Sequence, residues 1–299
     1  MAFLWKFVFL AIFSGFNSQP LLFNCEKEPD KCESKGYFYR DNNQLKSLVR
    51  GQDEILKEMS RFGNILEEIR NRISLLERTA LYKDCKELYD MGRRKSGVYS
   101  IYPLDLLHQV KSVQVYCDMD TAGGGWTVIQ NRVDGKVNFS RSWQGYKVGF
   151  GDVSTSYWIG NDVIHELTKD NSSLLYVSIT GKDGTTHYIQ YDTFSIAGED
   201  DDYRLYIAGN AFGTLDDRIR YRSGGDNING MKFSTYDKDN DLSSNHCTDT
   251  MGIGGWWFNK CNDAYLNGQY PPGKWSQPWH GTFDDGSKIS STKMMIKRK

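Results

Sequence analysis

A seven-residue repeat is the feature of this sequence that most restricts its fold. Apolar residues recur at the a and d positions of this repeat. In the same register, Arg72 and Glu77 fall at g and e positions, where an ion pair between chains can form. Apolar residues at further e and g positions (Val49, Leu56 and Ile65) widen the stripe and favour three or more strands. We therefore expect residues 45–80 to be a coiled coil through which the chain self-associates. The alternative is a single amphipathic helix that lies on the following domain. The a and d positions, apolar at all but one, are Leu45, Leu48, Gln52, Ile55, Met59, Phe62, Leu66, Ile69, Ile73, Leu76 and Ala80.

The N-terminal residues have the form of a secretion signal. Lys6 precedes a short apolar run from Phe7 to Phe13, which is an h-region and is too short to span a bilayer. We place the signal peptide at residues 1–18, and no other stretch approaches the roughly 20 apolar residues of a membrane helix. We therefore expect a secreted, extracellular protein without a membrane span.

Six cysteines in a secreted chain predict disulfides, and their spacing alone does not choose among the pairings. None has the C-x-x-C spacing of a zinc knuckle or a thioredoxin-type site. Cys25 and Cys32 lie in a polar segment, residues 19–44. Either they bond to each other or they join neighbouring chains, and the coiled coil favours the second arrangement by holding the chains together. The cysteines are Cys25, Cys32, Cys85, Cys117, Cys247 and Cys261.

Beyond residue 80 the helical periodicity ends and a globule of residues 81–299 begins. Gly, Asp and Asn turns separate short β-prone runs at residues 113–116, 126–130, 174–180, 187–191 and 203–208. One short helix is expected at residues 160–167, with Asn161 or Asp162 as its N-cap. Two sequons, at Asn138 and Asn171, predict glycans on surface loops.

The sequence lacks the signatures of two large classes of function, nucleic-acid binding and catalysis. The 37 basic and 38 acidic residues nearly cancel, so the chain has no electrostatic footprint for nucleic acid. The sequence contains neither a G-x-S-x-G elbow nor an H-E-x-x-H motif, and the glycines at 123–125 are not followed by the G-K-[ST] of a phosphate loop. We therefore expect a binding protein and not an enzyme.

Three aspartates at alternate positions, Asp237, Asp239 and Asp241, indicate either a cation site or a solvated acidic turn. An EF-hand needs Gly at its sixth position and Glu at its twelfth, and here those positions hold Leu242 and Thr248. The EF-hand interpretation therefore fails.

Longer stretches identify the globule as similar to a known family. DCKELYDMG (84–92), SGVYSIYP (96–103) and WIGNDVIHELT (158–168) are followed in order by GMKFSTYDKDND (230–241), GGWWFNKC (254–261) and YLNG (265–268). Together they resemble the fibrinogen C-terminal domain over about residues 82–299, as found in ficolins and tachylectin-type lectins. The resemblance implies an α+β globule with a twisted, largely antiparallel sheet, preceded here by a short coiled-coil helix. The collagen-like Gly-X-Y segment of ficolins is absent.

The resemblance implies particular roles for cysteines and metal ligands. It pairs Cys85 with Cys117 and Cys247 with Cys261. It assigns Ca²⁺ to the side chains of Asp239 and Asp241 and to the backbone carbonyls of Ser243 and Asn245. Asp237 would then lie outside the direct shell, and the ion would act as a structural brace.

In lectins of this family, backbone N–H groups around the second cysteine hold an acetyl oxygen, and aromatic residues enclose the methyl group. The matching positions here are Lys260, Cys261 and Asn262. The chain departs from the usual pattern at two positions, with Asn262 in place of a histidine and Met251 in place of an aromatic residue. Trp279, with Trp275, is a candidate aromatic wall, whereas Trp256 and Trp257 are expected in the core.

These implications favour a secreted, calcium-dependent, lectin-like protein that binds acetylated or other glycans on microbial surfaces in innate immunity. The alternative is a protein-binding module, such as a receptor ligand, a clotting component or a secreted toxin, because one fold serves many functions.

Overall fold

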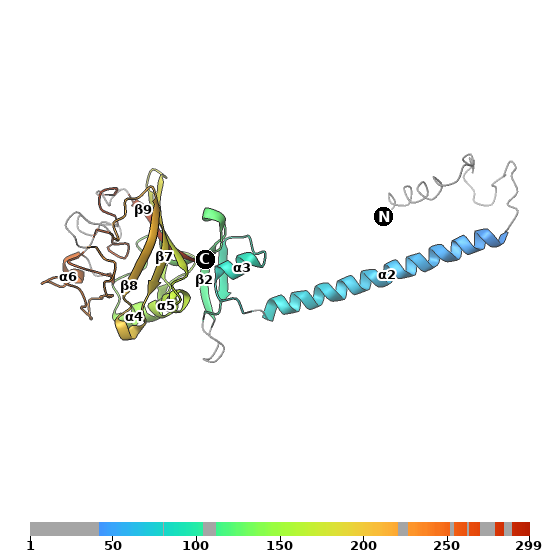
Figure 1. The fold of residues 1–299 in the computed structure, drawn as a ribbon, viewed down its shortest axis with the longest axis horizontal. Coiled ribbons are helices and arrows are strands. Elements are labelled where there is room, and N and C mark those ends of the chain that lie inside the picture. The colour runs from blue at the N-terminus through green and yellow to red at the C-terminus, as the bar shows by residue number, and fades with distance from the viewer. Residues whose placement is uncertain are drawn as a thin grey trace. The chain divides into compact units, whose positions relative to one another are not determined.

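The computed structural model describes residues 42–79, 81–103, 112–220, 227–251, 254–261, 263–269, 279–283 and 289–299 (Figure 1). The chain divides after Thr79 into two compact units. The predicted signal peptide, the two N-terminal cysteines and Asn262 lie outside the described residues. Within the ranges above, no helix has the length and apolar character needed to cross a bilayer.

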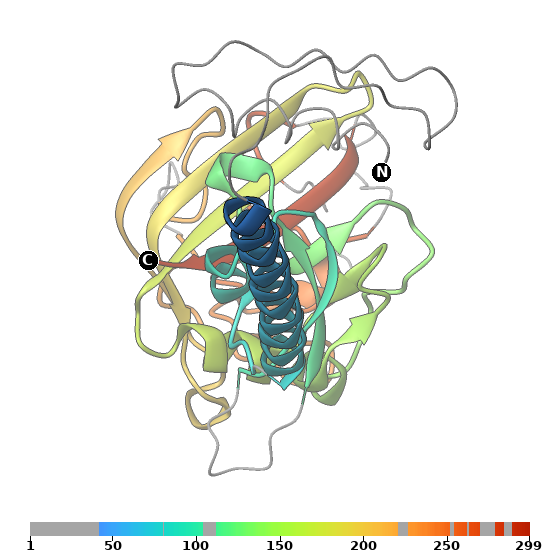
Figure 2. The same ribbon diagram turned by 90° about the vertical axis from the view of Figure 1, so that its right-hand side faces the viewer.

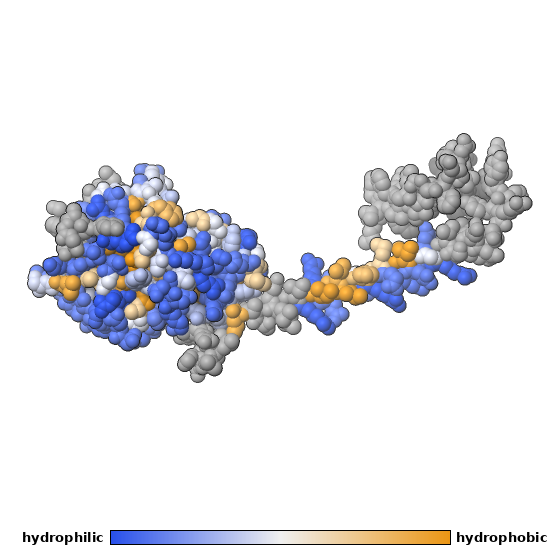
Figure 3. Space-filling view, viewed as in Figure 1, coloured by the Kyte–Doolittle hydropathy of each residue, from blue (hydrophilic) through white to orange (hydrophobic). Residues whose placement is uncertain are grey.

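The first unit is the helix α2 (Asn42–Thr79), which covers the segment predicted from the heptads. Its apolar stripe faces solvent in the single chain: Met59 and Phe62 are each 66% exposed. Figure 3 shows the stripe along one side of the helix, with hydrophilic residues on the other. Arg72 pairs with Glu68 of its own helix at 2.8 Å. The helix is therefore confirmed, and self-association through its apolar stripe stays a prediction.

The second unit is built on a nine-stranded sheet in which every pairing is antiparallel. The order is β1-β2-β3-β9-β6-β7-β8, with β5 paired to β3 and β4 to β5. The sheet is twisted, as Figure 2 shows. The predicted α+β fold with a twisted antiparallel sheet is confirmed. The strands are β1 (Gly97–Ile101), β2 (Val113–Asp118), β3 (Trp126–Arg132), β4 (Phe150–Gly151), β5 (Tyr157–Trp158), β6 (Ser173–Gly181), β7 (Thr186–Ile196), β8 (Leu205–Gly213) and β9 (Ile289–Arg298).

The strand nearest the C-terminus fills the middle of this sheet. β9 pairs with β3 on one side and with β6 on the other, so that Ile296 lies opposite both Thr127 and Leu175. Met294, Met295 and Ile296 are buried. Three successive buried residues are typical of a central strand covered on both faces.

Short helices cover the sheet and lead into its loops. They are α3 (Cys85–Asp90), η1 (Thr121–Gly123), α4 (Trp143–Val148), α5 (Asn161–Thr168), η2 (Glu199–Asp201) and α6 (Cys247–Met251). The predicted N-cap of α5 was wrong: Gly160 takes that position, with φ 109. Asn161 is instead the first helical residue, because its side-chain oxygen accepts the indole N–H of Trp158 at 2.9 Å in the core.

A cluster of aromatic rings joins the sheet to the loops beyond it. Phe233 is fully buried, and its ring centroid lies 5.1 Å from Tyr146, 6.0 Å from Trp158 and 5.1 Å from Trp257. Trp256 also packs against Trp257 and is buried. Both tryptophans therefore belong to the core, as the sequence predicts.

The two ends of this unit carry one disulfide each. At the α3 end, Cys85 and Cys117 are joined, with Cα atoms 5.5 Å apart. Cys247 and Cys261, at the α6 end, are joined with Cα atoms 5.3 Å apart. Both distances lie in the usual range for a disulfide, and the pairs are those that the family resemblance implies.

Candidate functional site

The aspartates lie in a loop, residues 235–246, that leaves the core at a fixed point. Ser234 and Trp256 exchange two backbone hydrogen bonds of 2.8 and 3.0 Å just before the loop begins. Asn240 then reaches back: its side-chain N–H donates to the Phe233 carbonyl at 2.7 Å, and its backbone N–H donates to the Ser234 hydroxyl at 3.0 Å. We call residues 235–246 the aspartate loop. The middle of the aspartate loop is therefore positioned by buried residues, although the loop forms no regular ladder of β-sheet hydrogen bonds.

Asp239 and Asp241 turn their carboxylates to the same side of this loop. Asp241 accepts the backbone N–H of Ser243 at 2.9 Å through one oxygen and that of Cys247 at 2.8 Å through the other. Asp239 accepts the N–H of Asp241 at 3.1 Å. Ligand atoms of Asp239, Asp241 and His246 all lie within 4.8 Å of one another.

The carboxylates of Asp239 and Asp241 repel each other. Burial raises the pKa of Asp241, and the neighbouring carboxylate of Asp239 raises it further. Hydrogen bonds from Cys247 and Ser243 act in the opposite direction without cancelling the rise. A divalent cation between the two carboxylates would remove this repulsion.

The donor set fits Ca²⁺, which takes oxygen ligands in a flexible shell. A carboxylate offers about four lone-pair sites, so the two N–H bonds to Asp241 leave acceptor capacity on each oxygen. Asp239 and Asp241 would hold the ion by their side chains, and Ser243 and Asn245 by their carbonyls. The bound ion would supply charge neutralisation and would fix the course of the loop.

Asp237 has a different partner. Its carboxylate accepts the backbone N–H of Trp143 at 2.8 Å and the hydroxyl of Thr235 at 2.7 Å. Because Trp143 begins α4, Asp237 ties the aspartate loop to that helix.

The segment between the paired cysteines, residues 247–261, is fastened to the aspartate loop at both ends. We call it the disulfide segment. Cys247 directly follows the loop, and the N–H of Leu242 donates to the Asn259 carbonyl at 3.0 Å near the other end. Asn259 in turn donates its N–H to the Cys261 carbonyl at 3.0 Å. A change in the loop therefore reaches the backbone around Cys261 through two short connections.

The backbone at Cys261 has an uncommon conformation. Its φ is 70, in the left-handed region that a non-glycine residue seldom adopts. Such a conformation persists only where the surroundings enforce it, and here the disulfide and the Asn259 hydrogen bond do so. Lys260 beside it is exposed and Cys261 is partly exposed. The two described residues of the predicted cradle therefore lie at the surface.

The other predicted ligand residues are less accessible or are not described. Met251 is the last residue of α6, and only its backbone is described. Trp279 has no exposed surface, and its indole N–H donates to the Asp216 carbonyl at 2.9 Å. The expectation that Trp279 forms a wall facing the ligand is therefore corrected: its ring is core, because its only polar group is satisfied internally.

A cavity that the sequence interpretation missed opens between the end of β3 and the turn at residues 267–269. Its volume is about 460 Å³, within the range typical of small-ligand sites. The buried Arg132 lines it and lies 4.1 Å from the centroid of the Phe139 ring. Lys136, Asn138 and Gln269 add polar groups. The sequon at Asn138 and the motifs at 254–261 and 265–268 mark this region in the sequence, but none of them indicates a cavity.

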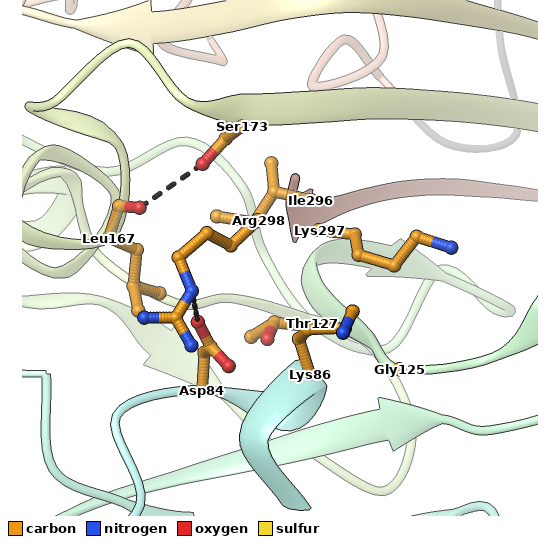
Figure 4. Close-up of a pocket in the computed structure, with 9 residues that line it drawn as sticks. All are labelled: Asp84, Lys86, Gly125, Thr127, Leu167, Ser173, Ile296, Lys297 and Arg298. Atoms are coloured by element: carbon orange, nitrogen blue, oxygen red, sulfur yellow. Dashed lines mark hydrogen bonds and ion pairs between the residues drawn. The ribbon is translucent and has the colours of Figure 1, made fainter. Parts of the chain in front are cut away.

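A second hollow, at the α3 end, is too small for a ligand. Its volume is about 10 Å³, room for about one water molecule. Figure 4 shows Arg298 turned toward Asp84, with 3.3 Å between the charged groups. Arg298 also pairs with Glu87 at 3.0 Å. These contacts join α3 to the end of β9 and have a structural role.

Both sequon asparagines are on the surface. Asn138 and Asn171 are exposed, and each side-chain oxygen accepts one hydrogen bond, from Ser140 N–H and Ser195 Oγ respectively. Their exposure is compatible with glycans, which stay a prediction.

Residues 81–298 match the family described as the C-terminal globular domain of fibrinogen beta and gamma chains, and the chain belongs to this family. Domains of this family are binding modules, which take protein or glycan ligands and oligomerise.

Individual relatives come from several branches. Human fibroleukin is 41% identical over 203 residues, which are 68% of this chain and 45% of fibroleukin. Mouse angiopoietin-2 is 33% identical over 277 residues, 90% of this chain and 53% of that protein. Ryncolin-4 of Cerberus rynchops is 38% identical over 204 residues, 68% and 54% of the two chains. The chain spans about half the length of these relatives.

Solved structures agree with the fold. The fibrinogen-like globe domain of human ANGPTL6 superposes with a TM-score of 0.65 at 32% identity, covering 74% of this chain and 96% of that one. A lamprey fibrin D-dimer, complexed with the peptide Gly-His-Arg-Pro-amide, superposes with a TM-score of 0.63 at 28% identity, covering 84% and 90%.

Proposed function

We propose that this chain is a secreted, oligomeric recognition protein of the lectin type, in which Ca²⁺ holds the aspartate loop and the backbone of the surface residues Lys260 and Cys261 binds a small group such as an acetyl on a microbial glycan. The observation that carries this proposal is the double connection of the loop to the disulfide segment. A cation at Asp239 and Asp241 would thereby control the backbone near Cys261 without touching the ligand.

Clustering of sites supports the proposal. A single shallow backbone site binds weakly, and several such sites on one oligomer gain avidity on a repetitive surface. The exposed apolar stripe of α2 supplies the means, because a helix with such a stripe is stabilised by association with other helices.

Retention on immobilised N-acetylated sugar tests the function. We expect the full chain to be retained at millimolar Ca²⁺ and to be eluted by free N-acetylglucosamine or by a chelator. Asp239→Asn with Asp241→Asn should abolish retention. The control pair Asp152→Asn and Asp183→Asn makes the same charge change in exposed turns that accept similar backbone N–H bonds, and it should bind normally. Failure of the unmodified chain to bind any glycan or acetylated matrix at millimolar Ca²⁺ would rule the lectin function out.

A protein ligand is the second candidate function. The lamprey fibrin structure, solved with a bound peptide, favours it, as does the burial of Trp279, which removes one expected wall of an acetyl pocket. The chain would then act as a receptor ligand, a clotting component or a toxin. Chelator-sensitive binding to an extracellular protein that has been enzymatically deglycosylated, without retention on any sugar matrix, would establish this alternative.

Oligomerisation can be tested separately by sedimentation. We expect the full chain without its signal peptide to form an oligomer of three or more chains and residues 81–299 to be monomeric. Globe domains of this family have been solved alone, so the shorter chain should fold. Phe62→Lys, in the apolar stripe, should weaken the oligomer, whereas Asn64→Lys, an exposed position outside the stripe, should not. A stable oligomer of residues 81–299 would contradict the coiled-coil assignment.

A further inference from the structure

His246 is a metal-ligating side chain that the proposed calcium site does not use. It directly precedes α6, at the end of the aspartate loop, and its side chain is 17% exposed. Its Nε2 atom is buried and has no hydrogen-bond partner among the described residues. The same atom lies 3.8 Å from a carboxylate oxygen of Asp239. A buried ring nitrogen without a partner is uncommon in folded proteins.

The other ring nitrogen has a carboxylate beside it. Nδ1 of His246 lies 4.0 Å from a carboxylate oxygen of Asp249, one helical turn further on. With its proton on Nδ1, the imidazole would turn an N–H group toward this carboxylate and would leave the lone pair of Nε2 free to bind a metal. A carboxylate behind an imidazole that faces a cation is the usual arrangement around metal-bound histidines.

We propose that the aspartate loop is also a transition-metal site, in which His246 Nε2 binds a Zn²⁺-like divalent cation together with the carboxylates of Asp239 and Asp241. Ca²⁺ takes oxygen ligands and gains nothing from an imidazole. Zn²⁺, by contrast, is well matched by one imidazole, two carboxylates and a water.

The separations suit such an ion after a small adjustment. Donors bound tetrahedrally to Zn²⁺ at about 2.0–2.1 Å lie about 3.3 Å apart. His246 and Asp239 are 3.8 Å apart, and the ligand atoms of all three residues lie within 4.8 Å of one another, so the loop would draw in by up to about 1.5 Å to bind Zn²⁺ tetrahedrally. Asp239 is 48% exposed on its side chain, so it has room to move.

Zn²⁺ and Ca²⁺ would share two carboxylates and therefore compete. The inference deepens the proposed calcium site but does not depend on it, because His246 acts on the transition metal alone. Since His246 adjoins Cys247, a metal bound through it would pull on the first residue of the disulfide segment.

Calorimetric titration with ZnCl₂ in calcium-free buffer tests the inference, using the full chain without a polyhistidine tag. We expect one saturable site per chain that excess Ca²⁺ displaces. His246→Gln should weaken Zn²⁺ binding by at least about tenfold and change the Ca²⁺ affinity by less than about twofold, since Ca²⁺ does not use the imidazole. The matched control is His280→Gln, at an exposed histidine outside the loop, and it should leave both affinities unchanged.

Each outcome decides a separate point. Absence of saturable Zn²⁺ binding, or equal Zn²⁺ affinity in His246→Gln and the unmodified chain, would overturn the inference. Near-ultraviolet circular dichroism of the variant shows whether it keeps its fold; should it unfold, His246→Asn replaces it. If Zn²⁺ binds through His246 while Ca²⁺ does not bind at all, the calcium proposal fails and the transition-metal site stands.

Discussion

The two ends of the globular unit are each closed by a disulfide, but the backbone around them is organised differently. At the α3 end, Cys117 lies within β2, which is hydrogen-bonded to β1 and β3 along a regular ladder. At the α6 end, the chain between residues 227 and 283 makes only isolated bridges within its described parts, such as Asn259 with Cys261 and Ala264 with Trp279. Figure 1 shows α3 and α6 at opposite ends of the unit.

This difference has a functional meaning. A ladder satisfies backbone groups by pairing them, so few N–H groups remain for a ligand. At the α6 end, backbone direction is set by side chains, by a disulfide and, in our proposal, by a cation. Such a region can present N–H groups to a ligand. Its backbone conformation depends on each of these side chains, on the disulfide and on the proposed cation. The following experiments test that contrast.

The largest effect is expected in the aromatic cluster that joins the sheet to the loops beyond it. Phe233→Ala should lower the free energy of unfolding by about 3–5 kcal/mol, because it leaves a cavity among three aromatic rings. Phe212→Ala, at a residue that is 52% exposed, should cost less than about 0.5 kcal/mol. Denaturant titration of both variants measures the difference. Similar losses in the two variants would show that the aromatic cluster contributes no more to stability than an exposed ring does.

The two disulfides should differ more in function than in stability. Replacing both cysteines of a pair by serine should lower the free energy of unfolding by about 3.7 kcal/mol for Cys85–Cys117 and by about 3.0 kcal/mol for Cys247–Cys261. These values follow from the loop-closure entropy for sequence separations of 32 and 14 residues. Only the second pair should also remove the calcium response, because it fastens the disulfide segment. Melting curves with and without Ca²⁺ compare them. A calcium response that survives without Cys247–Cys261 would contradict the proposed coupling.

Acid should weaken the α3 end through Asp118. Burial tends to raise the pKa of Asp118, but hydrogen bonds from Thr121 and the charge of Lys293 outweigh it and hold the pKa below its ordinary value. The unfolded chain therefore takes up its proton first as the pH falls. The stabilisation is complete above the ordinary Asp pKa of about 4 and is lost as the pH falls through the lower, folded value.

Asp118→Asn checks this assignment. The substitution should lower the free energy of unfolding by on the order of 1–2 kcal/mol at neutral pH. Below about pH 4 the variant should lose less of its remaining stability than the unmodified chain does. Asp120→Asn is a suitable control because Asp120 is exposed. Unfolding free energies measured between neutral and acid pH give the comparison, and an unchanged acid slope in Asp118→Asn would refute the role given to Asp118.

The smallest effect is that of the cation itself. With a dissociation constant of about 10⁻⁴–10⁻³ M, as in other extracellular modules, about 1 mM Ca²⁺ should stabilise the folded state by about 0.4–1.4 kcal/mol. Asp239→Asn with Asp241→Asn should abolish this increment, whereas Asp152→Asn with Asp183→Asn should keep it. Melting temperature as a function of Ca²⁺ concentration measures both. A persistent increment in the first variant would place the ion elsewhere.

Much of the architecture could be predicted from local patterns. The heptads located α2, and β-prone runs between turns located β2, β3, β6, β7 and part of β8, because these signals depend on near neighbours in sequence. The place of β9 between β3 and β6 could not be obtained in this way, since it depends on contacts between residues more than a hundred positions apart. The fold assignment, which includes such long-range pairing, came from the family resemblance.

The candidate site was predictable only in part, for similar reasons. Alternating aspartates and paired cysteines mark the loop in the sequence. Spacing does not reveal that Asn161 turns into the core or that Trp279 is buried. The unpaired Nε2 of His246 likewise depends on the course of the loop, and a histidine beside a cysteine gives no sequence signal of its own.

The central position of β9 has a consequence for how the protein is made. Ribosomes synthesise this strand after all the other described strands, so β3 and β6 emerge without the neighbour that pairs with both of them. Until residues 289–298 are translated, two long strand edges are open to wrong partners. Termination of translation before Ile289 would leave β3 and β6 without their shared partner, and we expect such a chain to be degraded without yielding a shortened binding protein.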